Sequence, residues 1–273
     1  MSQKNKSTKF VNIADPLVSI ITPTYNRPTW LQLTLKSLIN QTYPKWECIV
    51  QNDAGVDVEP VVKQFNDPRI KYYTNAENVG LSQTRNNAIK KSVGDYIIYL
   101  DDDDCVYNET LDFRLSRIKK LNADVVYSRV LRTYYERVGN TYQVKTHDLY
   151  WDSPFQKDLI LIQNIAPVNG VMSSRRANDF AGEFDTSLTT SEDWSHWVEM
   201  SRKYDFYETK IIDCECSYRL DLSQMTGTRT GYTDHLPYLY KKWREYAIDK
   251  NFVIEHQNNS LRARNLNPED YGL

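Results

Sequence analysis

Short apolar runs alternate with amphipathic stretches through the first half of the chain. Leu31, Leu35 and Leu38 recur at helical spacing after Thr29, which we expect to cap that helix. Similar spacing predicts helices over 58–65 and 82–92 and around Leu111. Apolar runs between them predict strands over 17–22, 47–51, 70–73, 95–100 and 124–127. This alternation predicts an α/β fold with one open, mostly parallel sheet flanked by helices.

The second half of the chain has a different pattern. Gly139-Asn140 separates two alternating segments and predicts a hairpin over 130–144. Strand-like runs over 168–173 and 206–218 flank a loop over 182–191 and a helix that begins near Glu192. We expect a disordered leader over 1–16, one domain over 17–232 and a helical extension over 233–273.

The extension contains an amphipathic pattern that predicts one helix over 237–254. Leu236, Leu239, Tyr240 and Trp243 fall on one apolar face, and lysines lie elsewhere. We expect this face to pack on the main domain. The alternative is that this basic helix lies on an anionic membrane at its inner face.

Composition and charge exclude several classes of protein. Lysine and arginine number 34 against 36 acids, which offers no general footprint for nucleic acid. Four cysteines without a C-x-x-C pattern are typical of reduced thiols in a cytoplasmic protein. No apolar run approaches the ~20 residues that span a bilayer, and the lysine-rich start does not resemble a signal peptide. The oligomeric state stays open.

Polar residues at the ends of the predicted strands are the candidate site, because open α/β sheets bind ligands there. Four adjacent aspartates, Asp101 to Asp104, directly follow the apolar strand over 95–100. Adjacent carboxylates repel one another unless a cation neutralises them, and hard ions such as Mn²⁺ or Mg²⁺ suit their oxygens. The run therefore indicates a metal site that can also hold a diphosphate, and a solvated acidic loop is the alternative.

A second acidic cluster lies at the start of a predicted helix. Thr189 and Glu192 have the spacing of a capping box, which places Glu192 and Asp193 in the first turn. The helix dipole there favours the carboxylate form that a general base needs. Helix capping alone is the alternative.

Asp53 and Arg85 are further candidates. Asp53 follows the strand over 47–51, where its carboxylate can accept from the imide of a pyrimidine base. Arg85 lies one turn into the helix that follows Asn78-Val79-Gly80, and an ordinary surface arginine is the alternative there.

Five segments in order resemble family 2 of the nucleotide-sugar glycosyltransferases, an inverting family with the GT-A fold. The segments span roughly residues 17 to 220 and are VSIITPTYNR at 18–27, IVQND at 49–53, NVGLS with Arg85-Asn86, YLDDDD at 99–104, and GEFD at 182–185 leading to Glu192-Asp193-Trp194. The resemblance implies a smaller mixed sheet on the acceptor side. It also implies transfer of a sugar, from a UDP-sugar in particular, to a saccharide or glycolipid acceptor in bacterial polysaccharide assembly.

The family also implies a role for each matched residue. Asp193 would be the catalytic base, Asp103 with Asp101 would bind the metal, and Glu192 and Trp194 would lie on the acceptor side. The residues that would contact the donor are Thr22, Pro23, Thr24, Tyr25, Arg27, Asp53, Arg85, Asp101 and Asp102. Ser223 to Thr226 lie where the family often orders a loop over the donor.

The sequence departs from the family pattern at two places. The usual D-x-D has a small residue between its acids, whereas Asp102 and Asp104 make the ligand assignment here ambiguous. Asn52 stands where many members carry a second acid.

Other functions fit the sequence less well. A nicotinamide dehydrogenase needs G-x-G-x-x-G after the first strand, and residues 22–27 contain no glycine. A sugar nucleotidyltransferase also expects a glycine-rich phosphate loop at that place. A non-catalytic carbohydrate-binding module is the third alternative, although it has no use for metal-binding acids together with a base.

Overall fold

The computed structural model describes residues 15–150, 154–221 and 235–273. Most of the expected leader therefore lies outside the described residues. The same is true of Ser223 to Thr226 and of the expected domain boundary at 232.

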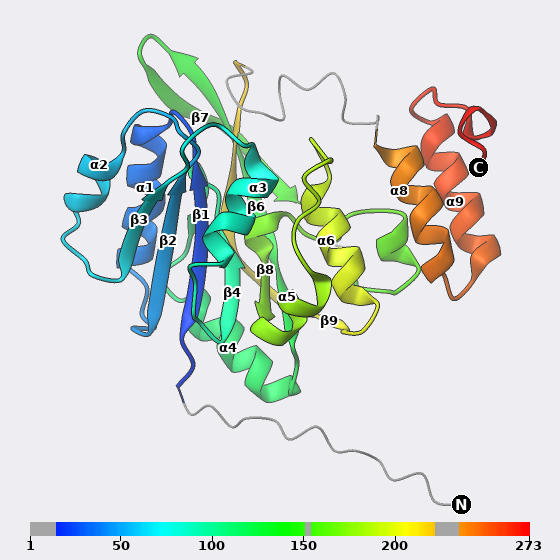
Figure 1. Ribbon diagram of the computed structural model, residues 1–273, viewed down its shortest axis with the longest axis horizontal. Coiled ribbons are helices and arrows are strands. Elements are labelled where there is room, and N and C mark those ends of the chain that lie inside the picture. The colour runs from blue at the N-terminus through cyan, green and yellow to red at the C-terminus, as the bar shows by residue number, and fades with distance from the viewer. Residues whose placement is uncertain (1–14, 151–153, 222–234) are drawn as a thin grey trace, which may run out of the picture.

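The described strands form one continuous sheet (Figure 1). Their bounds are β1 (Val18–Thr24), β2 (Trp46–Asn52), β3 (Ile70–Thr74), β4 (Tyr96–Tyr99), β5 (Cys105–Val106), β6 (Val125–Val138), β7 (Thr141–Tyr150), β8 (Val171–Ser174) and β9 (Phe206–Arg219). The order across the sheet is β3-β2-β1-β4-β8-β6-β9-β5, and β7 pairs with β6 as a hairpin. β3, β2, β1 and β4 are mutually parallel, as the alternation predicted. The mixed part begins at β8, which runs antiparallel to both β4 and β6, and it continues the same sheet.

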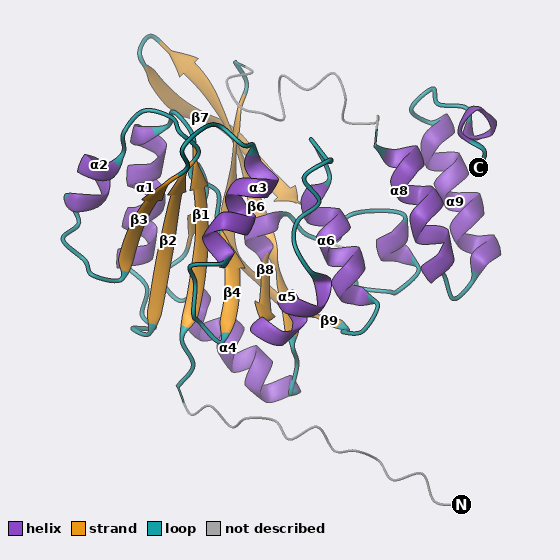
Figure 2. Cartoon of the chain, viewed as in Figure 1, coloured by secondary structure: helices purple, strands orange, loops and turns teal. Residues whose placement is uncertain are grey.

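Helices cover both faces of this sheet (Figure 2). The helices on one face are α1 (Pro28–Ile39), α2 (Glu59–Lys63) and α4 (Thr110–Leu121). Those on the other face are α3 (Leu81–Ile89), α5 (Arg175–Ala181) and α6 (Glu192–Ser201), with α8 (Leu236–Trp243) and α9 (Lys250–Arg262) beyond them. Strand β4 serves both layers because its side chains alternate: Ile97 and Tyr99 enter one core, and Ile98 enters the other.

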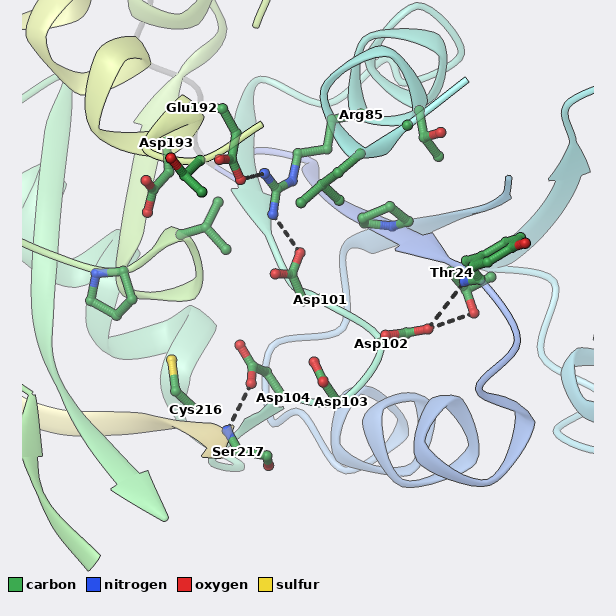
Figure 3. A pocket seen from close by; sticks show the side chains of 18 of the residues that line it. Thr24, Arg85, Asp101, Asp102, Asp103, Asp104, Glu192, Asp193, Cys216 and Ser217 are labelled. Atoms are coloured by element: carbon green, nitrogen blue, oxygen red, sulfur yellow. Dashed lines mark hydrogen bonds and ion pairs between the residues drawn. The ribbon is translucent and has the colours of Figure 1, made fainter. Parts of the chain in front are cut away.

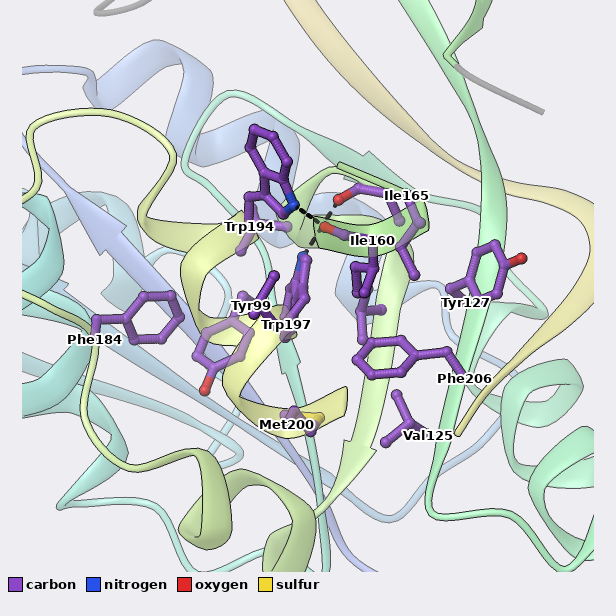
Figure 4. Close-up of a cluster of buried hydrophobic side chains, with 14 of the residues drawn as sticks. Tyr99, Val125, Tyr127, Ile160, Ile165, Phe184, Trp194, Trp197, Met200 and Phe206 are labelled. Atoms are coloured by element: carbon purple, nitrogen blue, oxygen red, sulfur yellow. Dashed lines mark hydrogen bonds between the residues drawn. The ribbon is translucent and has the colours of Figure 1, made fainter. Parts of the chain in front are cut away.

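Two tryptophans fix helix α6 in the core (Figure 4). Trp197 is fully buried, and its indole nitrogen donates to the carbonyl of Ala166 at 3.3 Å. Trp194 donates in the same way to the carbonyl of Ile160 at 2.6 Å, and its ring packs on Trp243 of α8 with centroids 4.8 Å apart. Buried indoles with satisfied N–H groups leave helix α6 little freedom to rotate.

The C-terminal extension differs from the single helix expected over 237–254. Helix α8 ends at Trp243 and is followed by a 3₁₀ turn (Arg244–Tyr246). Asp249 then starts α9 as its N-cap, accepting from the amide of Phe252 at 3.0 Å. This cap is the physical reason for the break, because an aspartate that bonds the backbone amide three residues later begins a new helix.

The apolar face of α8 is buried against the domain. Leu236, Leu239, Tyr240 and Trp243 are at most 1% exposed and belong to the same core as α6. This confirms the expected packing. Within the described ranges, no helix is both long enough and apolar enough to cross a membrane.

Two local predictions were wrong, and one helix was not predicted. Thr29 does not cap α1, because the helix already begins at Pro28, a residue whose fixed φ suits a first turn, and Arg27 takes the cap position. The strand expected from 168 begins at Val171, after a 3₁₀ turn. The sequence pattern did not indicate α5, a seven-residue helix whose first turn is capped by the Ser174 hydroxyl, which accepts from Ala177.

We expect Trp243→Ala to lower the free energy of unfolding by about 3–5 kcal/mol, the usual cost of emptying a buried tryptophan site. Tyr238→Ala is the matched control, because Tyr238 lies on the same helix but is 56% exposed. Chemical denaturation measures both variants. Equal small effects would contradict the packing of α8 on the domain.

Candidate functional site

A cavity of about 730 Å³ lies at the carboxyl ends of β1, β2 and β4, between the start of α6 and the end of β9 (Figure 3). Seven carboxylates and three guanidinium groups line it. These charged residues are Arg27, Asp53, Arg85, Asp101, Asp102, Asp103, Asp104, Arg132, Glu192 and Asp193. The cavity therefore has an excess of negative charge.

Arg85 joins the two acidic clusters that the sequence indicated. Its side chain is 1% exposed, and its two terminal nitrogens donate to Asp101 at 2.7 Å and to Glu192 at 2.9 Å. Asp101 follows β4, and Glu192 is the first residue of α6. One buried cation therefore fixes the distance between the aspartate run and the start of α6 (Figure 3).

Asp102 and Asp103 are held by arginines from other elements. Arg27 donates to Asp102 at 2.9 Å and to Asp103 at 3.1 Å, and Arg219 at the end of β9 lies 2.9 Å from Asp103. Asp102 also accepts from the hydroxyl of Thr24 at 2.7 Å. Burial, followed by the charge of Asp103, raises the pKa of Asp102 to about 7.

Burial also raises the pKa of Asp103, although Arg27 and Arg219 oppose the shift. Asp104 points toward β9, where it accepts from the backbone amide of Ser217 at 2.9 Å. Its pKa lies well above the ordinary value, first through burial and then through the charge of Asp103. The aspartate run thus lacks positive charge even with its arginines in place.

This donor set fits a divalent cation. Carboxylate oxygens are the ligands that Mn²⁺ and Mg²⁺ prefer, and a cation would relieve the repulsion that raises these pKa values. The described residues contain no group of three or more histidine, cysteine or acidic side chains converging on one ion position. Any such ion would therefore take further ligands from substrate or water, as Mg²⁺ commonly does.

Asp193 lies half-buried in the first turn of α6. It accepts from the amide of Asn164 at 3.2 Å and from the backbone of Trp194 at 2.6 Å. Burial, followed by the charge of Glu192, raises the pKa of Asp193 to about 7. The helix dipole at this position favours the carboxylate form, and burial acts in the opposite direction on the pKa.

The expected capping box is absent at the start of α6. Ser191 occupies the cap position without a capping hydrogen bond, and Glu192 turns to Arg85 instead. The hydroxyl of Thr189 lies 3.0 Å from the ring of His235. An ion pair with a buried arginine outweighs a cap to the backbone.

Asp53 holds the loop that precedes α3. Its carboxylate accepts from the backbone amides of Val79 at 2.8 Å and Gly80 at 2.9 Å, and from the side chain of Asn75 at 2.8 Å. Gly80 adopts a φ of +84°, which favours glycine. A carboxylate has about four acceptor positions, so Asp53 can still accept one further donor from the cavity.

The model of the family described as Glycosyl transferase family 2 matches residues 19–180, which is more than half of the chain. The chain belongs to glycosyl transferase family 2. The matched region contains β1 to β4 and the whole aspartate run, while Asp193 lies beyond its end.

Two curated relatives of this glycosyltransferase come from bacteria. The putative teichuronic acid biosynthesis glycosyltransferase TuaG of Bacillus subtilis is 35% identical over 258 residues, or 91% of this chain and 98% of TuaG. The UDP-Glc:alpha-D-GlcNAc-diphosphoundecaprenol beta-1,3-glucosyltransferase WfgD of Escherichia coli is 35% identical over 221 residues, or 79% of this chain and 81% of WfgD. The names of these two relatives refer to teichuronic acid biosynthesis and to a sugar linked to diphosphoundecaprenol.

Solved structures share the fold. TarS 1-349 of S. aureus in complex with UDP-GlcNAc has a TM-score of 0.67 at 16% identity, with coverage of 90% of this chain and 71% of that one. The mannosyltransferase PcManGT of Pyrobaculum calidifontis, in complex with GDP-Man and Mn2+, has a TM-score of 0.57 at 14% identity, with coverage of 91% and 74%. At these identities the likeness supports the GT-A fold of this glycosyltransferase.

The structure brings most of the predicted site residues to one cavity. Pro23, Thr24 and Tyr25 line it, whereas Thr22 is fully buried in β1 and accepts from the thiol of Cys48 instead. Trp194 lines the cavity but is only 4% exposed, so most of its ring belongs to the core.

Sequence reasoning missed several residues of the cavity. These are Asn78, Gly80, Leu81, Thr84, Arg132, Asn164, Pro167, Val168, Thr190, Ser191, Cys216, Ser217 and Tyr218. Cys216, Ser217 and Tyr218 lie near the end of β9. The strand itself was predicted from the sequence, but its parallel pairing with β6 was not. That pairing brings the end of β9 close to the aspartate run.

Arg85→Met should lower the free energy of unfolding by about 3–5 kcal/mol, because it leaves two partly buried carboxylates without their cation. Arg202→Met is the control, since Arg202 is 47% exposed and pairs with Glu199 at the surface. That change should cost no more than about 1 kcal/mol. Urea denaturation compares the two, and a loss at Arg85 as small as that at Arg202 would argue against the bridge.

Proposed function

We propose that this glycosyltransferase moves a sugar from a UDP-sugar to an acceptor hydroxyl with inversion at the anomeric carbon. The observation that carries this proposal is the placement of two kinds of acid in one cavity. A run of four aspartates, two of them buried, suits a metal and diphosphate, and a separate carboxyl with a pKa of about 7 suits a base (Figure 3).

The donor would occupy the strand-end side of the cavity. Asp53 would recognise the base with its remaining acceptor position, and the exposed ring of Tyr25 is available for stacking. Asp101 or Asp102 would contact the ribose. The remaining donor contacts that we propose are Pro23, Thr24, Arg27 and Arg85, all of which line the cavity.

Asp103 and Asp101 are the residues that we propose to hold Mn²⁺ or Mg²⁺. When bound, such an ion supplies positive charge that stabilises the departing diphosphate. Arg27 and Arg219 already contact Asp103, so these side chains would orient its carboxylate.

Asp193 would act on the acceptor. It would take the proton from the acceptor hydroxyl as that oxygen forms a bond to the anomeric carbon. The bond from that carbon to the diphosphate oxygen breaks at the same time, and UDP leaves with the electron pair. A base with a pKa close to neutrality is partly ionised at pH 7 and still basic enough to accept a proton.

The acceptor that we propose is a saccharide on a lipid diphosphate, by analogy with the acceptor in the name of WfgD. Such an acceptor would bring the enzyme to the inner face of the membrane as a peripheral protein. The test is the release of UDP from UDP-glucose and UDP-N-acetylglucosamine, with and without a synthetic α-N-acetylglucosaminyl diphosphate lipid. A non-catalytic binding module would release no UDP with any of these donors.

We expect UDP binding to weaken by about tenfold or more, equivalent to 1.4 kcal/mol, when EDTA replaces Mn²⁺. Asp103→Asn should remove this dependence on metal. Asp112→Asn is the matched control, because Asp112 lies exposed on α4, outside the cavity. Titration calorimetry gives the affinities, and equal UDP binding in Mn²⁺ and EDTA would remove the metal from the proposal.

Asp193→Asn should lower kcat by about 10²–10⁴, the usual contribution of a general base, while UDP affinity stays unchanged. Asp205→Asn, at an exposed position just beyond α6, should leave kcat unchanged. Steady-state kinetics and calorimetry measure both. Near-normal kcat in Asp193→Asn would show that another group takes the proton.

The pH profile separates Asp193 from Asp102, whose pKa also lies at about 7. If Asp193 must be ionised, kcat/KM falls as the pH drops below about 7. Glu192→Gln removes a negative charge that raises the pKa of Asp193, so the acidic limb should move to lower pH. An unmoved limb would assign it to Asp102 or to another group.

A further inference from the structure

Two buried hydroxyl groups without hydrogen-bond partners line the cavity next to Asp193. Thr190 is 2% exposed and Ser191 is 8% exposed, and the oxygens of both side chains have no partner within the described residues. Both residues line the main cavity. A buried hydroxyl without a partner destabilises a protein, so the pair is best explained by a ligand that satisfies it.

The backbone conformation of Ser191 also indicates a ligand site. Ser191 has a φ of +61°, a left-handed conformation that is unusual for a residue other than glycine. Such strain persists where the surrounding structure imposes it, and functional sites are common places for it. Because Asp193 follows within two residues, a ligand of these hydroxyls would lie beside the base.

An aromatic surface lines the same cavity from the sheet. The guanidinium of Arg132 on β6 lies 5.3 Å from the ring of Tyr134 and 5.6 Å from that of Tyr218 on β9. Two hydrogen bonds of 2.8 Å to Asp148 on β7 fix its orientation and balance its charge. Arg132 and Tyr218 line the cavity, so a planar guanidinium whose charge is paired and an aromatic ring lie together on its wall.

We propose that this pair of hydroxyls and the Arg132–Tyr218 surface form the subsite for the acceptor sugar. This inference rests on the proposed function, because Asp193 must be the base for its neighbours to hold the acceptor. The ligand class is an uncharged pyranose. The carboxylate of Asp193 disfavours an anion, hydroxyls bind hydroxyls, and the C–H face of a sugar ring packs on an aromatic ring.

The hydroxyls are tested with Thr190→Val and Ser191→Gly, which remove one oxygen each. Valine keeps the shape of threonine, and glycine accepts a positive φ without strain. Thr189→Val is the matched control, because the Thr189 hydroxyl contacts His235 and lies outside the cavity. The probes are methyl α-glucopyranoside and methyl α-N-acetylglucosaminide with saturating UDP and Mn²⁺, followed by saturation-transfer NMR.

Binding of at least one probe should weaken roughly three- to tenfold in Thr190→Val and Ser191→Gly, the range for one hydrogen bond. The melting temperatures should stay equal or rise, since no internal bond is lost. A purely structural role for the hydroxyls would instead lower the melting temperature and leave probe binding intact. That result, or the absence of any probe signal in the unaltered protein, would overturn the subsite.

The surface is tested with Tyr218→Ala and Arg132→Lys. Lysine keeps the charge but loses the planar group, so a subsite for a sugar ring predicts weaker probe binding in both variants. Tyr207→Ala, at the other end of β9 and outside the cavity, is the control. If Arg132→Lys bound both pyranosides normally, the surface would not be a sugar platform.

UDP affinity, measured by calorimetry on every variant, separates this inference from the proposed function. Unchanged UDP affinity with weakened probe binding supports an acceptor subsite. A parallel loss of UDP affinity would assign these residues to the donor and overturn the inference. Failure of the unaltered enzyme to bind UDP or to release it from UDP-sugars would instead count against the proposed function itself.

Discussion

The contact of Arg85 with Asp101 and Glu192 connects the two halves of the molecule. Arg85 comes from α3, Asp101 from the end of β4, and Glu192 from the start of α6, so one buried guanidinium positions three elements. Burying a cation is costly unless carboxylates pair with it, and both partners here approach to hydrogen-bond distance. The position of α3 is fixed in turn by Asp53, which binds the loop before that helix.

The same burial sets the chemistry of the cavity. Carboxyl groups removed from water and placed near one another bind protons more tightly, and both Asp102 and Asp193 reach a pKa of about 7. In the aspartate run, the raised pKa values reflect a lack of nearby positive charge, which a divalent cation would supply. For Asp193, it is an acidity suited to proton transfer near neutral pH. One physical cause therefore serves two different functions at two ends of a single cavity.

The C-terminal helix α8 supports helix α6, which carries the candidate base. Trp194, the neighbour of Asp193, packs on Trp243 of α8, and Glu199 of α6 pairs with Lys242 at 2.8 Å. Helix α6 is thus held between the sheet and the extension. The extension therefore belongs to the structure that supports the candidate base, although it lies beyond the region matched by the family model.

The parallel sheet and most candidate residues could be predicted because their signals are local. Strand periodicity, breaks at glycine and proline, and acids directly after apolar runs all lie within a few residues of one another. Asp101 to Asp104, Asp53 and Asp193 were found in this way, and Arg85 was found from its place in a motif.

Only the tertiary structure decided which of these residues contact one another. The partner of Glu192 is 107 positions away in the sequence, and that contact displaced a cap that local spacing had favoured. Likewise, the cavity contains Tyr218 only because β9 pairs parallel to β6. The pKa of Asp193 also depends on tertiary structure, because the burial that raises it comes from packing between segments that are distant in the sequence.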